Sequence, residues 1–199
     1  SVKSNQVFTL NQKDAINNWS YHHGITPGIF STDNSLNFKH KENTFIAFEI
    51  ERLIPHMLST QGPKMAVADV NGDRLDDLFI GGAKGQAGVL FIQNQSGGFN
   101  RSDQKVFEID SAAEDTNSAF FDANQDGFID LLVVSGGQEF EGNFENLRPR
   151  LYLNDGKGNF SRSASALPKE SNNGSVVISL DFDEDGDVDL FVGGGVKPG

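Results

Sequence analysis

The sequence predicts an all-β fold made of short strands. Twenty-two glycines punctuate the 199 residues, and 17 phenylalanines lie in brief apolar runs between clusters of Gly, Asn and Asp. This spacing is typical of short strands joined by tight turns rather than of helices. With 37% hydrophobic residues, the chain can bury the core of one domain or of two small ones.

An internal repeat organises most of the chain. The segments that start at Ala66, Ala119 and Ile178 share one pattern, in which an aspartate-rich loop separates two apolar runs. A strand, glycine turn and strand follow the first two copies, at residues 90–99 and 151–160. A period of roughly 50–60 residues with four short strands per unit predicts β-propeller blades of four-stranded antiparallel sheets. Residues 61–199 would then form two full blades and a partial third, and we expect an incomplete propeller that belongs to a larger polypeptide. The alternative is an open repeat array that is complete in itself.

Each aspartate-rich loop places oxygen side chains at positions 1, 3, 5 and 9. In chain order these positions hold Asp69, Asn71, Asp73 and Asp77; Asp122, Asn124, Asp126 and Asp130; and Asp181, Asp183, Asp185 and Asp189. Oxygen donors at alternate positions of a tight loop converge on one point and would repel one another without a hard cation between them. We therefore expect up to three Ca²⁺ ions, with position 9 as a bidentate ligand and a backbone carbonyl at position 7, which is Leu75, Phe128 or Asp187.

An EF-hand opens with the same spacing but needs a bidentate glutamate at position 12 and flanking helices. Position 12 here is Ile80, Val133 or Val192, so an EF-hand is excluded and each loop is expected to be a β-hairpin connection. Arg74 occupies position 6 of the first loop, where the other two have glycine and a left-handed backbone is expected.

The loops resemble the FG-GAP or VCBS repeats of integrin-α-like propellers. Their calcium loop, D-x-[DN]-x-D-G-x-x-D-[LIV], is matched in full at residues 122–131 and 181–190 and departs at Arg74 in the first copy. Residues 152–160 resemble the outer-strand hairpin of the same repeats, and parts of residues 37–63 resemble the lead-in to the propeller in surface proteins of the ASPIC/UnbV class, similar to cartilage acidic protein. This resemblance implies an exported, calcium-loaded protein, most often from Bacteroidota, with no established activity.

The same resemblance implies a domain order. Residues 1–15 would be the tail of a preceding ASPIC/UnbV domain, residues 16–60 a linker that leads into the propeller, and residues 61–199 the blades. The function that we expect is non-enzymatic binding of a protein or glycan at the cell surface or outside the cell. A more specific form is an accessory lipoprotein of a bacterial outer-membrane nutrient-uptake complex.

Composition excludes several classes of function. Sixteen Lys and Arg against 28 Asp and Glu give a net charge of −12, which disfavours nucleic acid and anionic membranes as partners. No cysteine is present, so disulfides, thiolate metal sites and a cysteine nucleophile are excluded. The apolar runs are too short for a membrane span.

An enzyme is the alternative reading, for example a glycan lyase or hydrolase acting in a propeller channel. Its acid-base groups would come from the four histidines (His22, His23, His40 and His56) or from a set made of Glu49, Glu51, Arg52 and His56. We favour a linker role for the first histidine pair and solvent exposure for the charged set, and we expect no catalytic residue.

Overall fold

The structure is a computed structural model that describes residues 36–50, 52–55, 57, 60, 62–140, 144–168 and 173–195. The chain divides into two units, Ser1–Asn34 and Ser35–Gly199, and all described residues lie in the second. The expected boundary near residue 15 falls outside the described residues. The boundary near residue 60 stays a prediction.

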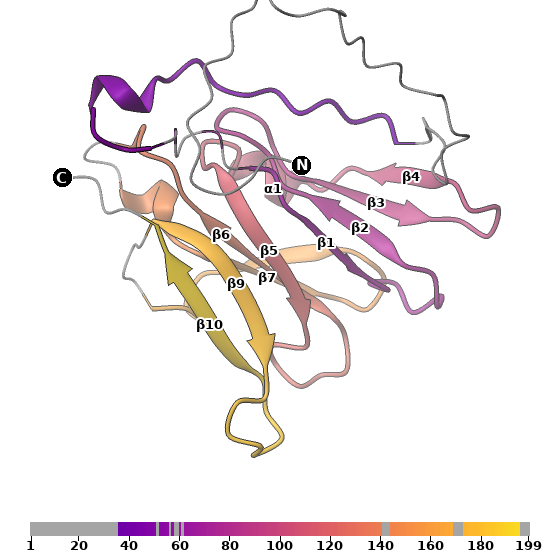
Figure 1. Cartoon of the computed structure of the whole chain (residues 1–199). Coiled ribbons are helices and arrows are strands. Elements are labelled where there is room, and N and C mark those ends of the chain that lie inside the picture. The colour runs from indigo at the N-terminus through magenta and orange to yellow at the C-terminus, as the bar shows by residue number, and fades with distance from the viewer. Residues whose placement is uncertain are drawn as a thin grey trace, which may run out of the picture. The chain divides into compact units, whose positions relative to one another are not determined.

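The described residues form two four-stranded antiparallel sheets and one two-stranded sheet (Figure 1). The first sheet consists of β1 (Met65–Ala68), β2 (Asp77–Ile80), β3 (Val89–Gln93) and β4 (Phe99–Ser102). The second consists of β5 (Asp115–Phe121), β6 (Asp130–Ser135), β7 (Arg150–Asn154) and β8 (Phe160–Ser163), and the third of β9 (Gly174–Leu180) and β10 (Asp189–Gly194). Strand order follows chain order in both four-stranded sheets, as in propeller blades. The prediction of an all-β fold made of four-stranded blades is confirmed.

Strand pairing places the repeat in the same register in each sheet. Ala68 pairs with Asp77 at the end of the first hairpin, Phe121 pairs with Asp130 in the second, and Leu180 pairs with Asp189 in the third. Each aspartate-rich loop therefore joins the first two strands of its sheet, as the sequence predicts. The three loops lie on one side of the molecule, the lower side in Figure 1, while the connections from β2 to β3 and from β6 to β7 lie on the other.

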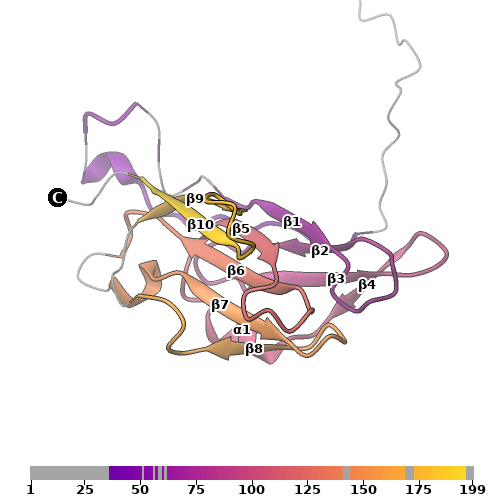
Figure 2. The same ribbon diagram turned by 90° about the horizontal axis from the view of Figure 1, so that it is seen from below.

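Side chains from alternate strand positions pack into layers between the sheets. The layer between the first and second sheets includes Phe79 of β2 and Leu131 of β6. The layer between the second sheet and β9 includes Leu132 of β6 and Val177 of β9. Leu131 and Leu132 are neighbours in the chain but enter different layers, because successive side chains of a strand point to opposite faces. Viewed from below, the sheets follow one another as successive layers (Figure 2).

The outer face of the first sheet is covered by the segment that precedes it, residues 36–50, which we call the lead-in segment. Leu36 and Phe38 pack there against Leu78 and Phe91. Farther along, the segment contains only a single 3-10 turn, η2 (Ala47–Glu49). Ala47 is buried within it.

Two further short helices interrupt the strands. α1 (Lys105–Ile109) follows β4, and η3 (Phe144–Leu147) precedes β7. Phe107 of α1 is buried and makes edge-on contacts with Phe79 and Tyr152, with ring centroids 5.3 and 5.0 Å apart. In the described part of the chain, none of the helices has the length and apolar character that a membrane crossing requires.

A buried ion pair of the second blade is hydrogen-bonded to the first blade at the side opposite the aspartate-rich loops. The Arg150 guanidinium on β7 contacts the Asp115 carboxylate at the start of β5, and it also donates a 2.8 Å hydrogen bond to the Ser135 hydroxyl. Asp115 in turn accepts a hydrogen bond of 2.8 Å from the backbone amide of Gly82, in the connection between β2 and β3 of the first blade. A buried pair is costly to desolvate, but it is costlier still to leave one of its partners alone.

Candidate metal centre

The first aspartate of each loop shapes the turn by accepting backbone amides. In the first loop, Asp69 accepts hydrogen bonds from the amides of Gly72 (2.8 Å) and Arg74 (2.7 Å). In the second and third loops, the amide at position 6 donates in the same way, from Gly127 to Asp122 at 2.8 Å and from Gly186 to Asp181 at 3.1 Å. The position 1 carboxylate therefore faces the interior of its loop, where it would meet a cation.

Positions 3 and 5 differ between the loops. In the first two, a side-chain amide donates to the neighbouring carboxylate, from Asn71 to Asp73 at 3.1 Å and from Asn124 to Asp126 at 2.8 Å. The third loop has aspartate at both positions, so neither side chain can donate such a bond in its ionised form. The third loop therefore has no side-chain amide between the carboxylates at these two positions.

Carboxylates converge most closely in the third loop. One oxygen from each of Asp181, Asp183 and Asp189 lies within 4.8 Å of the other two. Of the remaining predicted ligands in that loop, the Asp185 side chain is outside this group, and Asp187 was expected to contribute only its backbone carbonyl. The first two loops bring no comparable trio of carboxylates together among the residues that the structure describes.

The aspartate at position 9 has a role that sequence reasoning missed. Asp77 is buried and accepts one backbone amide from its own loop, that of Val70 at 3.0 Å, and one from β3, that of Gln93 at 2.9 Å. Asp130 does the same in the second blade, with the amides of Ala123 (3.0 Å) and Asn154 (2.8 Å). The repetition of this aspartate before each second strand was visible in the sequence, but its link to the third strand depends on the pairing of the sheet.

Burial raises the pKa of both carboxyls. For Asp77, the backbone amides of Gln93 and Val70 oppose that rise, while the charges of Asp73 and Asp69 add to it. Asp130 shows the same order of causes in the second blade. In the third loop, the charge of Asp185 is the largest cause of a raised pKa at the exposed Asp187. Neighbouring carboxylates thus add to the rise at Asp77 and Asp130 and lead it at Asp187, and a bound cation would offset this part of each shift.

The donor set fits a hard cation. The side chains at positions 1, 3, 5 and 9 carry carboxylate or amide oxygens, backbone carbonyls are available at position 7, and neither histidine nor cysteine lies in any of the loops. Calcium takes six to eight such oxygens in flexible geometry, whereas zinc is bound mostly through nitrogen and sulfur. The third loop fits best, because three of its carboxylates already converge.

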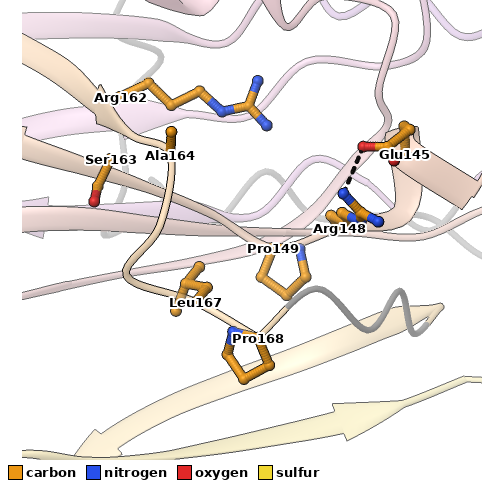
Figure 3. A pocket seen from close by; sticks show the side chains of 8 residues that line it. All are labelled: Glu145, Arg148, Pro149, Arg162, Ser163, Ala164, Leu167 and Pro168. Carbon is orange, nitrogen blue, oxygen red and sulfur yellow. Dashed lines mark hydrogen bonds and ion pairs between the residues drawn. The ribbon is translucent and has the colours of Figure 1, made fainter.

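A separate pocket of about 300 Å³ lies beside β8 and η3 (Figure 3). Its floor is apolar, with Pro149, Leu167 and Pro168, and the Arg162 and Arg148 side chains border it above. Arg148 donates a 2.8 Å hydrogen bond to Glu145, and Arg162 contacts the Asp110 carboxylate. Both guanidinium groups are thus engaged with carboxylates, and no histidine is among the lining residues.

The residues considered for acid-base chemistry do not meet in the described part of the chain. His22, His23, Glu51 and His56 lie outside the described residues. The His40 ring nitrogen lies 2.8 Å from the Glu42 carboxylate, and Glu49 and Arg52 are exposed. The described residues therefore supply no catalytic constellation from this set.

Comparison with known proteins agrees with the repeat architecture. The family model for the FG-GAP-like repeat matches residues 69–133 and 122–192, which together make up well over half of the chain. Integrin alpha-V of Gallus gallus is 29% identical over 159 aligned residues, which cover 66% of this chain but only 14% of that protein. The matched segments contain all three aspartate-rich loops and most of the strands around them, so this chain belongs to the family of FG-GAP-like repeat proteins.

Proposed function

We propose that this chain is a calcium-binding, non-enzymatic propeller module of a cell-surface or secreted protein, and that it binds a protein or glycan partner. The membership of the FG-GAP-like repeat family and the likeness to integrin alpha-V support a binding module rather than an enzyme. The observation that carries the calcium assignment is the convergence of Asp181, Asp183 and Asp189 within 4.8 Å.

In this proposal each loop holds one Ca²⁺ ion through positions 1, 3, 5 and 9 and the carbonyl at position 7. The ligands are Asp69, Asn71, Asp73, Leu75 and Asp77 in the first loop, Asp122, Asn124, Asp126, Phe128 and Asp130 in the second, and Asp181, Asp183, Asp185, Asp187 and Asp189 in the third. Each oxygen of a carboxylate has two lone pairs, so position 9 can accept backbone amides and still bind a cation. The ions would stiffen the hairpins, and the connections at the opposite side would form the contact face.

A finer assignment places the chain in the ASPIC/UnbV class as a part of a larger bacterial protein, with an accessory role in nutrient uptake at the outer membrane. Its support is the resemblance of parts of residues 37–63 to the lead-in of that class. The alignment covers only 14% of the length of integrin alpha-V. The similarity to integrin alpha-V is therefore compatible with many different full-length proteins that contain such repeats.

The first test is thermal unfolding of the 199-residue chain in millimolar Ca²⁺ and in chelator. A ligand that binds only the folded state stabilises it by about 2.7 kcal/mol per site at 100 times its dissociation constant. We therefore expect a clearly higher midpoint in Ca²⁺. Equal midpoints, together with no heat of binding in calorimetry, would contradict the proposal.

Two variants of the third loop sharpen this test. Asp183→Ala removes a converging carboxylate, so we expect the strongest calcium-binding step to disappear. Asp187→Ala is the matched control, because it removes an exposed carboxylate but keeps the backbone carbonyl, and it should leave that step in place. Asp189→Ala should also abolish the third site, although the loss of its 2.9 Å bond from the Phe182 amide would weaken the hairpin as well.

The three loops should fill in order of their charge. At positions 1, 3, 5 and 9 the third loop has four carboxylates, whereas the first has three, with Arg74 at position 6. During a calcium titration we expect the third loop to fill before the first. Asp73→Ala should therefore remove a weaker step than Asp183→Ala does, and the reverse order would refute the ranking.

A further inference from the structure

The pocket beside β8 and η3 adjoins a second, smaller pocket, and both lie on the side of the second blade opposite the aspartate-rich loops. η3 belongs to the connection from β6 to β7, and Ser163 at the end of β8 pairs with Leu151 near the start of β7. The smaller pocket has a volume of about 120 Å³. Glu145 and Arg162 line both pockets and therefore lie at the boundary between them.

The Arg162 guanidinium is anchored by a buried carboxylate. Its Nη1 atom contacts the Asp110 Oδ1 atom, and the Asp110 side chain is only 8% exposed. The other oxygen of Asp110 accepts a 2.8 Å hydrogen bond from the Tyr152 hydroxyl, which fixes the carboxylate in place. The Arg162 side chain itself is 41% exposed, and among the residues that the structure describes its guanidinium binds Asp110 alone. Because a guanidinium has several N–H donors in a planar fork, the others remain available to a ligand.

Arg148 already binds a carboxylate that is easily exchanged. Its Nη1 atom donates a 2.8 Å hydrogen bond to Glu145 Oε2, three residues earlier in the chain. The Glu145 side chain is 70% exposed, so this is a surface ion pair, and pairs of that kind contribute little to stability. Glu145 thus shows where a carboxylate binds Arg148, and a carboxylate of another molecule can replace it at little cost.

The floor of the larger pocket provides apolar surface next to these charges. Pro149, Leu167 and Pro168 lie below the two arginines (Figure 3). Proline side chains lose almost no conformational entropy when they are covered, so much of the floor is already formed for an apolar group. None of the lining residues is aromatic, so no ring face is available for a sugar to stack on, which favours an aliphatic peptide side chain.

The balance of charge favours a carboxylate over a phosphate. In the free chain, the positive charges of Arg148 and Arg162 are matched by one carboxylate each. Once Glu145 is displaced, the two arginines and Asp110 leave a single positive charge, which one carboxylate neutralises. A phosphate group carries more negative charge than this, and the chain already has a net charge of −12.

We propose that the two pockets bind an acidic segment of a partner protein. A glutamate or aspartate carboxylate of that segment takes the place of Glu145 on Arg148 and also accepts hydrogen bonds from the free donors of Arg162, while a neighbouring aliphatic side chain covers the apolar floor. This inference rests on the proposed function and deepens it, because it names the chemistry of the partner at the contact face opposite the aspartate-rich loops.

The test is an NMR titration of the ¹⁵N-labelled chain in Ca²⁺ with a capped peptide, acetyl-Gly-Leu-Glu-Gly-amide, and with its neutral counterpart that has Gln in place of Glu. We expect saturable shifts of the Ser163 and Ala164 backbone amides with the first peptide. The second should bind about tenfold more weakly, because hydrogen bonds to a charged group are lost. Equal binding of the two peptides, or shifts confined to other parts of the chain, would overturn the proposal. Tighter binding of a disaccharide that contains glucuronic acid would overturn it too.

Variants of the exposed ion pair should change peptide binding in opposite directions. Arg148→Gln removes one guanidinium and should weaken binding of the Glu peptide by about tenfold. Glu145→Gln removes the competing carboxylate and should strengthen binding by about two- to fivefold. Arg101→Gln is the matched control, because Arg101 is an exposed arginine paired with Asp103 away from both pockets, and it should leave the affinity unchanged. Weaker binding in Glu145→Gln would show that no ligand carboxylate replaces Glu145.

The same samples distinguish this inference from the calcium assignment on which the proposed function depends. If Ca²⁺ raises the unfolding midpoint of the chain but the Glu peptide does not bind, this inference fails and the calcium-binding module stands. If the Glu peptide binds as expected and Ca²⁺ has no effect on the midpoint, the calcium assignment fails and the peptide site stands.

Discussion

Asn154 shows how much a single side chain can do at the junction of two blades. Its Nδ2 atom donates to the backbone carbonyl of Val70 in the first aspartate-rich loop at 2.8 Å and to that of Ile129 in the second at 2.9 Å. Its Oδ1 atom accepts the amides of Gly156 and Gly158. One buried side chain thereby connects two neighbouring loops to the β7–β8 turn.

We expect Asn154→Ala to lower the free energy of unfolding by about 2–4 kcal/mol, because each buried polar group left without a partner costs about 1–3 kcal/mol. Urea denaturation of both proteins would measure the difference. Gln93 occupies the equivalent position in the first blade, where the structure gives its side chain no such bonds, so Gln93→Ala should cost less than 1 kcal/mol. Equal losses in the two variants would show that the bridge between the loops contributes nothing.

The residue types of the candidate site could be predicted from the sequence, but several of their contacts could not. The repeat alone marks positions 1, 3, 5 and 9 of the loops as oxygen donors. The pairing of Asp77 with the Gln93 amide depends on the third strand, and the hydrogen bond from Asn154 to Val70 joins the second blade to the first loop. Contacts of this kind have no local pattern, because they arise only when distant segments pack together.

At the scale of the element, the three aspartate-rich loops share a backbone conformation that the sequence shows only in part. Positions 4 and 6 have positive φ in every loop: Gly72 and Arg74, Gln125 and Gly127, and Glu184 and Gly186. Each loop thus has one glycine and one residue with a side chain in the left-handed region, and the first loop places its glycine at position 4 instead of 6. The expected left-handed backbone at position 6 is present even where Arg74 occupies it, with φ of 69°.

The left-handed region costs a residue with a Cβ atom about 1–2 kcal/mol. We therefore expect Arg74→Gly to stabilise the chain by about 1 kcal/mol and to strengthen calcium binding by the first loop, which also loses a positive charge. Gly127→Ala should destabilise by a similar amount, because nothing lies within 4 Å of the added Cβ and backbone strain alone remains. Chemical denaturation in chelator measures both effects, and a loss of stability in Arg74→Gly would contradict this account.

The regular elements followed from the sequence more completely than the irregular ones. Repeated apolar runs and glycine turns predict all the strands of the two blades. α1 has only five residues, and no side chain caps its start at Gln104, so it leaves no helical signature in the sequence. Its formation depends on Phe107, which fills the space between Phe79 and Tyr152.

At the scale of the whole molecule, one strand position shows how the sheets follow one another. The second residue after the position 9 aspartate is Phe79 in the first sheet, Leu132 in the second and Phe191 in the third. Phe79 and Leu132 are 1% and 0% exposed, since each is covered by the next sheet, whereas Phe191 is 59% exposed. Ile178, which pairs with Phe191, is exposed as well.

The exposed apolar face of β9 and β10 should cause self-association of the 199-residue chain, because exposed apolar faces and unpaired strand edges favour contact between molecules. Sedimentation velocity should show dimers or larger species whose fraction rises with concentration. Phe191→Ser should shift the chain toward monomer, while Leu53→Ser, which changes an almost fully exposed side chain outside the sheets, should not. A parent chain that stays monomeric at high concentration would contradict this expectation.

The layered packing of the blades also has a consequence for the evolution of such a chain. Because Phe79 and Leu132 enter successive layers from the same strand position, the forward face of one blade matches the backward face of the next. A gene segment that encodes one blade can then be duplicated in tandem, and the new copy finds a compatible neighbour on each side without further substitutions. The unequal spacing of the three loops indicates where such copies afterwards diverge, in the connections that lie outside the shared layers.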